Sequence, residues 1–382
     1  MKVLFISHDA SRTGAPLILL RLAQWIKKNE AQAAFDFLLL RGGELEAEFE
    51  ATGKVYRYFE TGKKSNSLSA RIKRRLTKPD YRKEVRGRLA KEGYNLIYAN
   101  TIASCSVAVE ISGMKLPKIP LVLHVHELDT VIRQLEPAFD QLSGKVDVFI
   151  AVSHAVKKNL LENRKVPGLK LREVSEFIIA EEMQEASGSS KTHDLFSRLA
   201  GKFIVGGSGN VHWRKGADLF LQTARCVFQE EPGFNGVFLW VGNVSAHERI
   251  VLDEDIRKLG LEEKVFFPGP QNPPYEWFRL FDVFLMTSRE DPFPIVSLEA
   301  GALGKPVICF EKAGGTEEML NGAGGKVVGY MDTGAMADAV LHYYWSPEEK
   351  NRDGKKNAAH FAQYDINRVA PELMKVIHEQ AG

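Results

Sequence analysis

The chain has little cysteine, little net charge and no long apolar segment. Its three cysteines, Cys105, Cys226 and Cys309, lie far apart among 382 residues and show no metal-ligand spacing. This argues against a disulfide scaffold or a structural zinc site and fits a reducing compartment. With 51 Lys and Arg against 49 Asp and Glu, the net charge of +2 gives no global field that indicates nucleic acid as a partner. No run of about 18 apolar residues exists, so the sequence predicts no membrane span.

The opening sequence, MKVLFISHDAS, has an apolar run of only four residues, which is too short for a signal peptide. Apolar residues make up 44% of the chain, which excludes disorder as its main state. A domain usually has about 100–200 residues, so the length indicates two domains. The sequence therefore predicts a cytoplasmic protein with two globular domains.

Short apolar runs alternate with helix-length segments in both halves of the chain. Uninterrupted apolar runs of this kind are typical of parallel strands that are covered on both faces. The sequence predicts two doubly wound α/β domains that face each other across a cleft. The predicted strands are Val3–Ser7, Phe35–Leu40, Leu96–Ala99, Pro120–His126 and Val146–Val152, then Phe203–Val205, Gly236–Val241, Lys264–Phe267, Asp282–Met286 and Pro306–Phe310.

A Ser/Gly-rich segment, Glu185–Thr192, has the composition of a linker. It sets the predicted domains at 1–184 and 185–361. The remaining segment, 362–382, contains an amphipathic pattern over Asn367–Gln380. We expect this terminal helix to pack back onto the first domain.

An anion site is predicted where a helix begins in the sequence DPFPIVSLEAGA. Pro294 suits the first turn of this helix, and the amides of Ile295 and Val296 would lack intrahelical partners and could bind a phosphate. Glu299 lies about 7–8 Å further along the helix axis, and Asp291 precedes the helix. Both carboxylates could accept hydrogen bonds from hydroxyl groups of one ligand. Each acid alone also fits a structural role, as a helix-start acid or a solvated charge.

A second candidate for anion binding is the glycine-rich turn GGSGNVHWRKG, which includes Gly209. Glycines let the backbone approach an anion, and Arg214 and Lys215 could neutralise a departing diphosphate. The alternative is a flexible loop with a solvated basic pair.

Two further turns contain small residues. In HDASRTGAP, Gly14 and Ala15 open a helix after the first strand, where the backbone could approach a phosphate or a sugar. In GGTEE, Thr316 is expected to cap a helix.

Histidines are paired at the end of one predicted strand, in the sequence LHVHE. Residues at i and i+2 share a face, so His124 and His126 should point together while Glu127 points away. A metal pair would lack a third ligand, so no metal site is predicted. His126 is interpreted as a hydrogen-bonding residue of the cleft, with a satisfied core histidine as the alternative. Asn100 and Thr101 close another strand and could line the same region.

One stretch, Lys63–Lys91, carries twelve Lys and Arg against two acidic residues. Apolar residues recur there every four positions on either side of Pro79. This predicts two basic amphipathic helices, which suit a peripheral contact with an anionic membrane. A solvated helix pair is the alternative. Nucleic-acid binding is not expected, because no aromatic platform accompanies the charge.

Taken together, five segments in this order resemble the retaining glycosyltransferases of family 4 (group 1): GSGNVHWRKGADLF, FLWVGN, VFFPGP, FDVFLMTSREDPFPIVSLEAGALGKPVI and GGTEEML. The resemblance covers the second half closely and the first more loosely, through MKVLFISH, LHVHE and DVFIAVS. It implies a GT-B fold of two Rossmann-like domains. Residues 1–184 would form the acceptor-side domain and 185–361 the nucleotide-sugar-binding domain.

The resemblance also implies roles for the acidic and basic residues. The acidic pair of the family falls on Asp291, where Glu is usual, and on Glu299. The first acid would hold hydroxyls of the donor sugar and the second the ribose. The phosphate-contacting lysine falls on Lys215. The upstream arginine of the family is absent, since Gly209 and Asn210 stand there, and Arg214 is the proposed substitute.

Two further positions follow from the resemblance. Pro294 occupies a position that is usually glycine, which removes one amide donor. The cleft histidine of the family falls on His126.

The implied function is transfer of a hexose, with retention, from a nucleotide diphosphate sugar to a saccharide or lipid-linked acceptor. UDP is the expected nucleotide, and neither a metal nor a cofactor is expected. Two alternatives stay open: a nucleotide-sugar-binding module that has lost catalysis, and a GT-B nucleotide-sugar epimerase.

Overall fold

The structure is a computed structural model that describes residues 1–59, 81–185 and 194–382. The chain divides into two compact units, Met1–Ser175 with Val369–Gly382, and Glu176–Arg368. The predicted domain boundary lies after residue 184, whereas the compact units divide after Ser175. Of the predicted linker, only Glu185 lies within the described residues, where it ends helix α9 (Ala180–Glu185).

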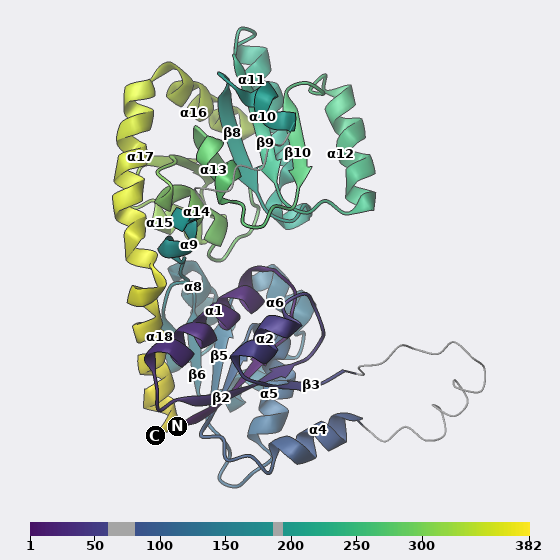
Figure 1. The fold of residues 1–382 in the computed structure, drawn as a ribbon, viewed down its shortest axis with the longest axis vertical. Coiled ribbons are helices and arrows are strands. Elements are labelled where there is room, and N and C mark those ends of the chain that lie inside the picture. The colour runs from purple at the N-terminus through teal and green to yellow at the C-terminus, as the bar shows by residue number, and fades with distance from the viewer. Residues whose placement is uncertain (60–80, 186–193) are drawn as a thin grey trace, which may run out of the picture. The chain divides into compact units, whose positions relative to one another are not determined.

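The first unit contains a parallel sheet of seven strands in the order β3-β2-β1-β4-β5-β6-β7 (Figure 1). Its central strands are buried almost throughout, as their uninterrupted apolar sequences require. The strands are β1 Lys2–Ser7, β2 Ala34–Leu39, β3 Lys54–Arg57, β4 Leu96–Asn100, β5 Leu121–Val125, β6 Val148–Ala151 and β7 Leu171–Glu173.

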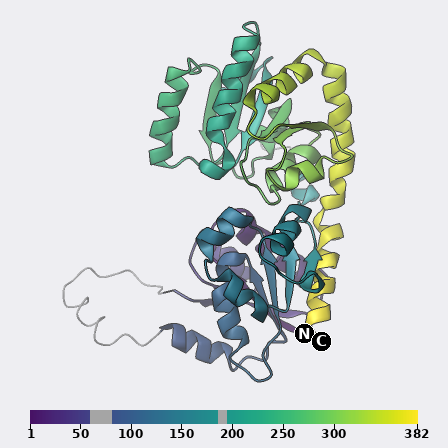
Figure 2. The same cartoon turned by 180° about the vertical axis from the view of Figure 1, so that it is seen from behind.

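Helices cover both faces of this sheet (Figures 1 and 2). The α-helices are α1 Gly14–Asn29, α2 Glu46–Thr52, α4 Tyr81–Leu89, α5 Cys105–Ser112, α6 Asp129–Leu135, α7 Phe139–Leu142, α8 His154–Glu162 and the greater part of α18 Ile366–Ala381, and the short 3₁₀ helices are η1 Ile102–Ser104, η2 Ser143–Lys145 and η3 Gly168–Lys170. Because parallel strands all end at one edge, the residues after β1, β4 and β5 gather there. That edge carries His8, Thr101 and His126.

The second unit repeats this plan with six parallel strands in the order β10-β9-β8-β11-β12-β13. The strands are β8 Phe203–Ser208, β9 Gly236–Val241, β10 Val265–Gly269, β11 Val283–Met286, β12 Val307–Phe310 and β13 Gly325–Val328. The other elements are α9, α10 Asp194–Leu199, η5 Trp213–Lys215, α11 Ala217–Glu230, α12 Ala246–Lys258, α13 Tyr275–Leu280, α14 Ile295–Ala302, α15 Gly315–Met319, α16 Thr333–Trp345, α17 Pro347–Phe361 and η6 Ala362–Tyr364. The prediction of two doubly wound α/β halves is thus confirmed.

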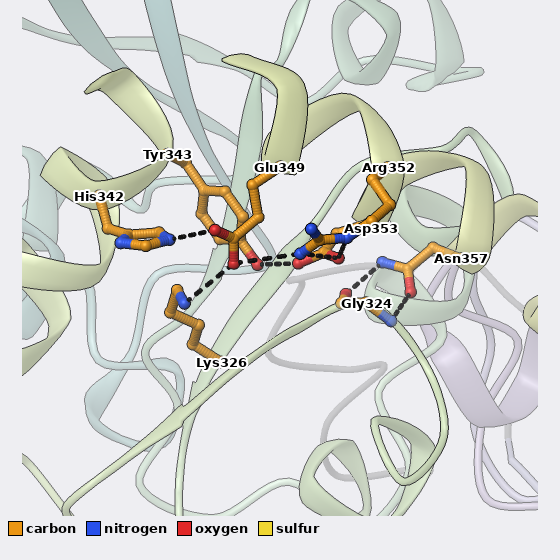
Figure 3. A network of polar contacts seen from close by, with 8 residues as sticks. All are labelled: Gly324, Lys326, His342, Tyr343, Glu349, Arg352, Asp353 and Asn357. Atoms are coloured by element: carbon orange, nitrogen blue, oxygen red, sulfur yellow. Dashed lines mark hydrogen bonds and ion pairs between the residues drawn. The ribbon is translucent and has the colours of Figure 1, made fainter. Parts of the chain in front are cut away.

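A polar network ties the edge of the second sheet to α16 and α17 (Figure 3). The buried Asn357 accepts from the Gly324 amide at 2.6 Å and donates to the Gly324 carbonyl at 2.6 Å. Tyr343 donates to Asp353 at 2.8 Å, and Glu349 lies between His342 and Lys326. Asn357 thereby satisfies the backbone just before β13, which pairs with β12 on one side.

The terminal amphipathic helix predicted at Asn367–Gln380 is α18, and from Val369 onward it belongs to the first unit. Its apolar side chains are buried, namely Val369, Leu373, Met374, Val376 and Ile377. The burial follows the spacing of three and four residues that defines one face of a helix.

The basic stretch is described only from residue 81 onward, so the first of its two predicted helices lies outside the described residues. The second is α4, which buries Val85 and Leu89. Two of its cations stack on aromatic rings of the first unit, Arg82 over Tyr58 at 5.3 Å and Arg88 over Tyr56 at 5.2 Å. Within the described parts of the chain, no helix is both long and apolar enough to cross a membrane.

Candidate active site

The sequence-predicted charges of the second unit meet in one cluster at the carboxyl ends of β8 and β11. Lys215 Nζ lies 2.6 Å from Asp291 Oδ2, and Arg214 Nη1 lies 3.2 Å from Asp291 Oδ1. Ser288 Oγ donates to the same Asp291 Oδ2 at 3.2 Å. Only 12% of the Lys215 side chain and 8% of the Asp291 side chain are exposed, so this is an ion cluster inside the protein. One carboxylate therefore positions two cations.

Burial and charge act in opposite directions on this pair. Burial lowers the pKa of Lys215 below its ordinary value, and the neighbouring Asp291 carboxylate only partly opposes this. Burial alone would raise the pKa of Asp291, but the cations of Lys215 and Arg214 outweigh it, so the pKa of Asp291 is lowered. At neutral pH Asp291 is therefore ionised and pairs with the two cations.

Two glycines let the loop after β8 come close to its neighbours. Gly216 has φ +69°, and a Cβ there would lie 2.1 Å from the Thr287 carbonyl oxygen at the end of β11. At Gly209, which has φ +135°, a Cβ would lie 3.1 Å from Cε of Lys215. The Lys215 side chain therefore crosses Gly209 at a distance that a larger residue would disturb.

The backbone of Asp291 is held from the other side by Gly314 and Gly315, where α15 begins. Its amide donates to the Ala313 carbonyl at 2.6 Å, and its carbonyl accepts from the Gly315 amide at 3.0 Å. A Cβ on Gly314, which has φ +128°, would lie 1.9 Å from that carbonyl oxygen. The prediction that Thr316 caps this helix is wrong, because α15 begins at Gly315 and Thr316 lies inside it. The glycine pair is needed for contact with Asp291.

Helix α14 begins one residue later than predicted, at Ile295, directly after this cluster. Pro294 is not in its first turn but precedes it in an extended conformation, with ψ 108°, which is usual at such a position. A proline side chain cannot cap a helix, and the first turn contains no acid. The amides of Ile295 and Val296 thus stand at a positive helix end that no carboxylate of this turn neutralises.

Glu299, one turn further along α14, is buried, with 7% of the residue exposed. The Tyr275 hydroxyl of α13 donates to its Oε1 at 3.3 Å. The reading of Glu299 as a solvated surface charge is therefore wrong. A buried carboxylate needs polar partners, and a ligand hydroxyl is one that fits.

In the first unit, the structure joins two sequence-predicted features through Asn100. His126 Nε2 lies 2.9 Å from Asn100 Oδ1, and Asn100 Nδ2 donates to the Ala15 carbonyl at 2.9 Å. Gly14 and Ala15 form the first turn of α1, as predicted. The histidine at the end of β5 and the turn that opens α1 therefore share one hydrogen-bonding residue.

His124 and His126 lie on one side of their strand, as predicted, with ring centroids 4.2 Å apart. His124 is the core histidine of the pair, since it is 1% exposed and its Nδ1 lies 2.7 Å from the Tyr98 hydroxyl. Burial, and next the charge of His126, lower the pKa of His124 well below its ordinary value. Within the described residues, no group of three or more His, Cys, Asp or Glu is placed to hold a metal ion.

Two further acidic side chains lie near these residues, and neither was assigned a role from the sequence. Glu127 Oε2 accepts the amides of His126 at 2.9 Å and of Ile102 at 3.1 Å. In the second unit, Glu290 Oε1 is buried and has no hydrogen-bond partner among the described residues. Glu290 directly precedes Asp291, and only its acidic character could have pointed to it from the sequence.

Two doubly wound parallel halves, with a buried acid–cation cluster at the strand ends of the second, define a protein of the GT-B glycosyltransferase type. Residues 202–344 match the family described as Glycosyl transferases group 1, and residues 38–181 match Glycosyltransferase Family 4. Together these two matches span most of the chain, which belongs to the group 1, family 4 glycosyltransferases.

Curated relatives are similar to parts of the chain. A D-inositol 3-phosphate glycosyltransferase of Arthrobacter sp. (strain FB24) is 26% identical over 181 residues, which are 47% of this chain and 43% of the relative. The lipopolysaccharide core biosynthesis mannosyltransferase LpsB of Rhizobium meliloti is 30% identical over 147 residues, 37% of this chain and 41% of the relative. The matches thus span about half or less of these relatives.

Solved structures are similar over the whole chain. Anabaena Alr3699/HepE in complex with UDP and glucose superposes with a TM-score of 0.77 at 20% identity, covering 99% of this chain and 100% of that one. The lipopolysaccharide outer core galactosyltransferase WaaB gives a TM-score of 0.73 at 14% identity, covering 100% of both chains. At these identities the likeness supports the fold.

Proposed function

We propose that the protein is a retaining glycosyltransferase that moves a hexose from a UDP-sugar to a saccharide or lipid-linked acceptor. The observation that carries this proposal is the cluster in which Lys215 and Arg214 share the carboxylate of Asp291 just before α14. The family membership and the complexes of Alr3699/HepE with UDP, with UDP and glucose and with UDP-glucose support the choice of donor.

Charge stabilisation is the main task of the second unit in this proposal. When the bond between the anomeric carbon and the diphosphate breaks, negative charge builds up on the leaving diphosphate. Lys215, Arg214 and the amides at the start of α14 would stabilise that charge. Because Asp291 already holds both cations in place, they need not reorganise during the reaction, and such preorganised groups contribute several kcal/mol.

The remaining steps follow from the family resemblance. The acceptor hydroxyl attacks the anomeric carbon on the face that the diphosphate leaves, a new C–O bond forms, and a diphosphate oxygen takes the acceptor proton. Asp291 would bind hydroxyls of the donor sugar and Glu299 the ribose, and His126 would be the hydrogen-bonding histidine of the family. Gly209, Gly14 and Ala15 would let the backbone approach the donor. No cofactor takes part, and the two cations and the helix start take the place of a metal ion.

The acceptor and the location of the protein belong to the same proposal. A basic stretch that contacts an anionic membrane would bring the enzyme to a lipid-linked acceptor at the inner face of the membrane. In α4, Arg82 and Arg88 lie over tyrosine rings, and both residues are exposed. Membrane contact and a cytoplasmic location stay predictions.

Replacement of Lys215 by alanine tests the proposal. We expect kcat for hexose transfer to fall by about 10²–10³-fold, the effect of removing one preorganised charge-stabilising donor. Arg214 still pairs with Asp291, so the variant should fold, which a thermal melt would verify. Lys202→Ala, at an exposed position of the same unit, is the control. Near-normal transfer by Lys215→Ala would remove Lys215 from the mechanism.

Two incubations distinguish the proposed transferase from the alternatives: the donor without acceptor tests for an epimerase, and the donor with a panel of acceptors tests for a binding module. An epimerase would alter the sugar of the donor, whereas a transferase would leave it largely intact until acceptor is added. A binding module would bind UDP but show no turnover with any acceptor.

A further inference from the structure

Trp213 is an exposed tryptophan next to the acid–cation cluster of the second unit. The residue is 60% exposed, and it directly precedes Arg214 and Lys215 in η5. Two other tryptophans of this unit, Trp240 and Trp277, are buried. Tryptophan is highly buried on average in folded proteins, so an exposed one beside a candidate active site is a candidate for contact with a ligand.

Hydrogen bonds hold the turn that carries Trp213 against the segment that carries Asp291. The Arg289 amide donates to the Arg214 carbonyl at 2.8 Å. Nη1 of Arg289 donates to the Trp213 carbonyl, also at 2.8 Å. The backbone of Trp213 is therefore tied to a residue only two positions before Asp291, and its place beside the cluster is fixed.

One face of the Trp213 ring is covered by a cation. Cζ of Arg289 lies over the ring, 5.7 Å from its centroid. Both terminal nitrogens of this guanidinium donate to the Asp218 carboxylate, at 3.0 and 2.6 Å, so it is held in place. Because one face is covered and 60% of the residue is still exposed, the opposite face of the indole is open to solvent.

Polar and aromatic groups accompany this open ring. The Tyr330 hydroxyl donates to the Arg289 carbonyl at 3.2 Å, and Tyr330 is 45% exposed. The side chain of Asp218 is 56% exposed and offers carboxylate oxygens. A sugar ring fits such a surface, because its C–H bonds can lie on the negative face of an aromatic ring while its hydroxyls reach the polar groups. A stable protein interface would need about 800 Å² on each side, far more than two side chains provide.

We propose that Trp213 is a specificity-determining residue that stacks on a sugar ring of the saccharide acceptor. Tyr330 and Asp218 lie at the edge of the same binding surface. The family resemblance assigns no residue of the second unit to the acceptor, so this contact is additional to the roles given above. The identification of the sugar as the acceptor rests on the proposed function, whereas the binding of a sugar ring by Trp213 does not.

Saturation-transfer NMR with cellotetraose tests the proposal without any assay of transfer. In this β-linked glucose oligomer every ring hydroxyl is equatorial, so both faces of each ring present C–H bonds to an aromatic surface. The wild-type protein should transfer saturation most strongly to these ring protons. Trp213→Ala should bind the oligomer about tenfold more weakly, because the aromatic face is lost. Trp213→Tyr keeps an aromatic face and should retain most of the binding.

Trp345→Ala is the matched control. Trp345 is 64% exposed and ends α16, where its ring lies against that of Tyr344 with the centroids 4.6 Å apart. This variant removes an equally exposed indole of the same unit and should bind cellotetraose like the wild type. Thermal melts verify that each variant is folded. In calorimetry, Trp213→Ala should bind UDP with the affinity of the wild type.

The kinetics of transfer test the assignment to the acceptor. With an acceptor from the panel described above, we expect kcat/KM for the acceptor to fall about tenfold in Trp213→Ala. KM for the UDP-sugar should stay near wild type in this variant, and Trp345→Ala should leave both quantities unchanged.

Absence of cellotetraose binding by the wild type, or equal binding by Trp213→Ala, would overturn the proposal. Weaker UDP binding by Trp213→Ala would mean that the indole holds the uracil base, and it would overturn the assignment to the acceptor. If the wild type transferred a hexose to no acceptor, the proposed function would fail, while the NMR result would still decide whether Trp213 binds a sugar ring.

Discussion

Asp291 binds two cations through separate carboxylate oxygens, and this geometry explains how a shortened acid can serve the site. Because the Asp291 carboxylate is buried, its negative charge must be paired, and it forms ion pairs with Lys215 and Arg214. Loss of Asp291 would leave both cations without their shared partner, whereas loss of Lys215 leaves Arg214 in place. The carboxylate is therefore the more sensitive of the two positions for folding.

His124 makes stability depend on pH. Its pKa in the folded protein is well below the ordinary 6.5, so below pH 6.5 the unfolded chain binds a proton that the folded chain excludes. The free energy of unfolding should therefore fall as the pH drops below 6.5, by up to about 1.4 kcal/mol per pH unit. Urea unfolding of wild type and His124→Gln between pH 7.5 and 5 measures this. Equal slopes for the two proteins would contradict the assignment.

At the residue scale, the sequence predicted which side chains matter better than it predicted their surroundings. The Asp291, Lys215 and Arg214 cluster could be anticipated as a set of charges at strand ends. The burial of Glu299 could not, because the Tyr275 hydroxyl that meets it comes from a different helix, 24 positions away in the chain. Contacts of this kind depend on tertiary packing, which local spacing does not encode.

Among the elements, the junction of η5 with α11 depends on Gly216. An alanine there would place its Cβ 2.1 Å from the Thr287 carbonyl oxygen, so the backbone near Lys215 would have to move. We expect Gly216→Ala to lower the free energy of unfolding by about 3 kcal/mol or more and to reduce transfer.

Gly260 offers a matched control for this prediction. It has nearly the same conformation, with φ +66°, but a Cβ there would meet no atom within 4 Å. Gly260→Ala should therefore cost only the left-handed backbone strain, about 1–2 kcal/mol, and leave transfer unchanged. Equal effects of the two substitutions in chemical denaturation would show that the close approach to Thr287 is unimportant.

The strands that the sequence did not predict all lie at sheet edges. β3 and β7 are the two edges of the first sheet, and β13 is one edge of the second. Their sequences, KVYR, LRE and GKVV, contain no long apolar run, because an edge strand is not enclosed on all sides. Central strands such as β4 and β9 are buried along their whole length, and their apolar sequences were correctly assigned.

For the whole molecule, the chain leaves the first unit at Ser175 and returns to it through α18. Leu373 on that helix is fully buried, whereas the neighbouring Glu372 is exposed. We expect Leu373→Ala to lower the free energy of unfolding by about 2–5 kcal/mol. Glu372→Ala should change it by less than about 0.5 kcal/mol. Similar unfolding midpoints for the two variants would mean that the helix adds little to the first unit.

The arrangement of two doubly wound halves was predictable because buried parallel strands and their helices leave a strong periodic signal. The points of division were less predictable. The Ser/Gly-rich composition at Glu185–Thr192 suggests a boundary there, while the compact units divide after Ser175. Composition reports where the chain lacks apolar residues, and the division of units depends on which residues contact one another in space.

Calorimetric titration with UDP tests the central claim most directly. Wild-type protein should bind UDP, and Glu299→Gln should bind it about tenfold more weakly with little change in melting temperature. Glu262→Gln, which changes an exposed acid of the same unit, should bind like wild type. Absence of UDP binding by the wild type, or equal affinity of Glu299→Gln, would contradict the proposal that a nucleoside diphosphate occupies the start of α14 with its ribose on Glu299.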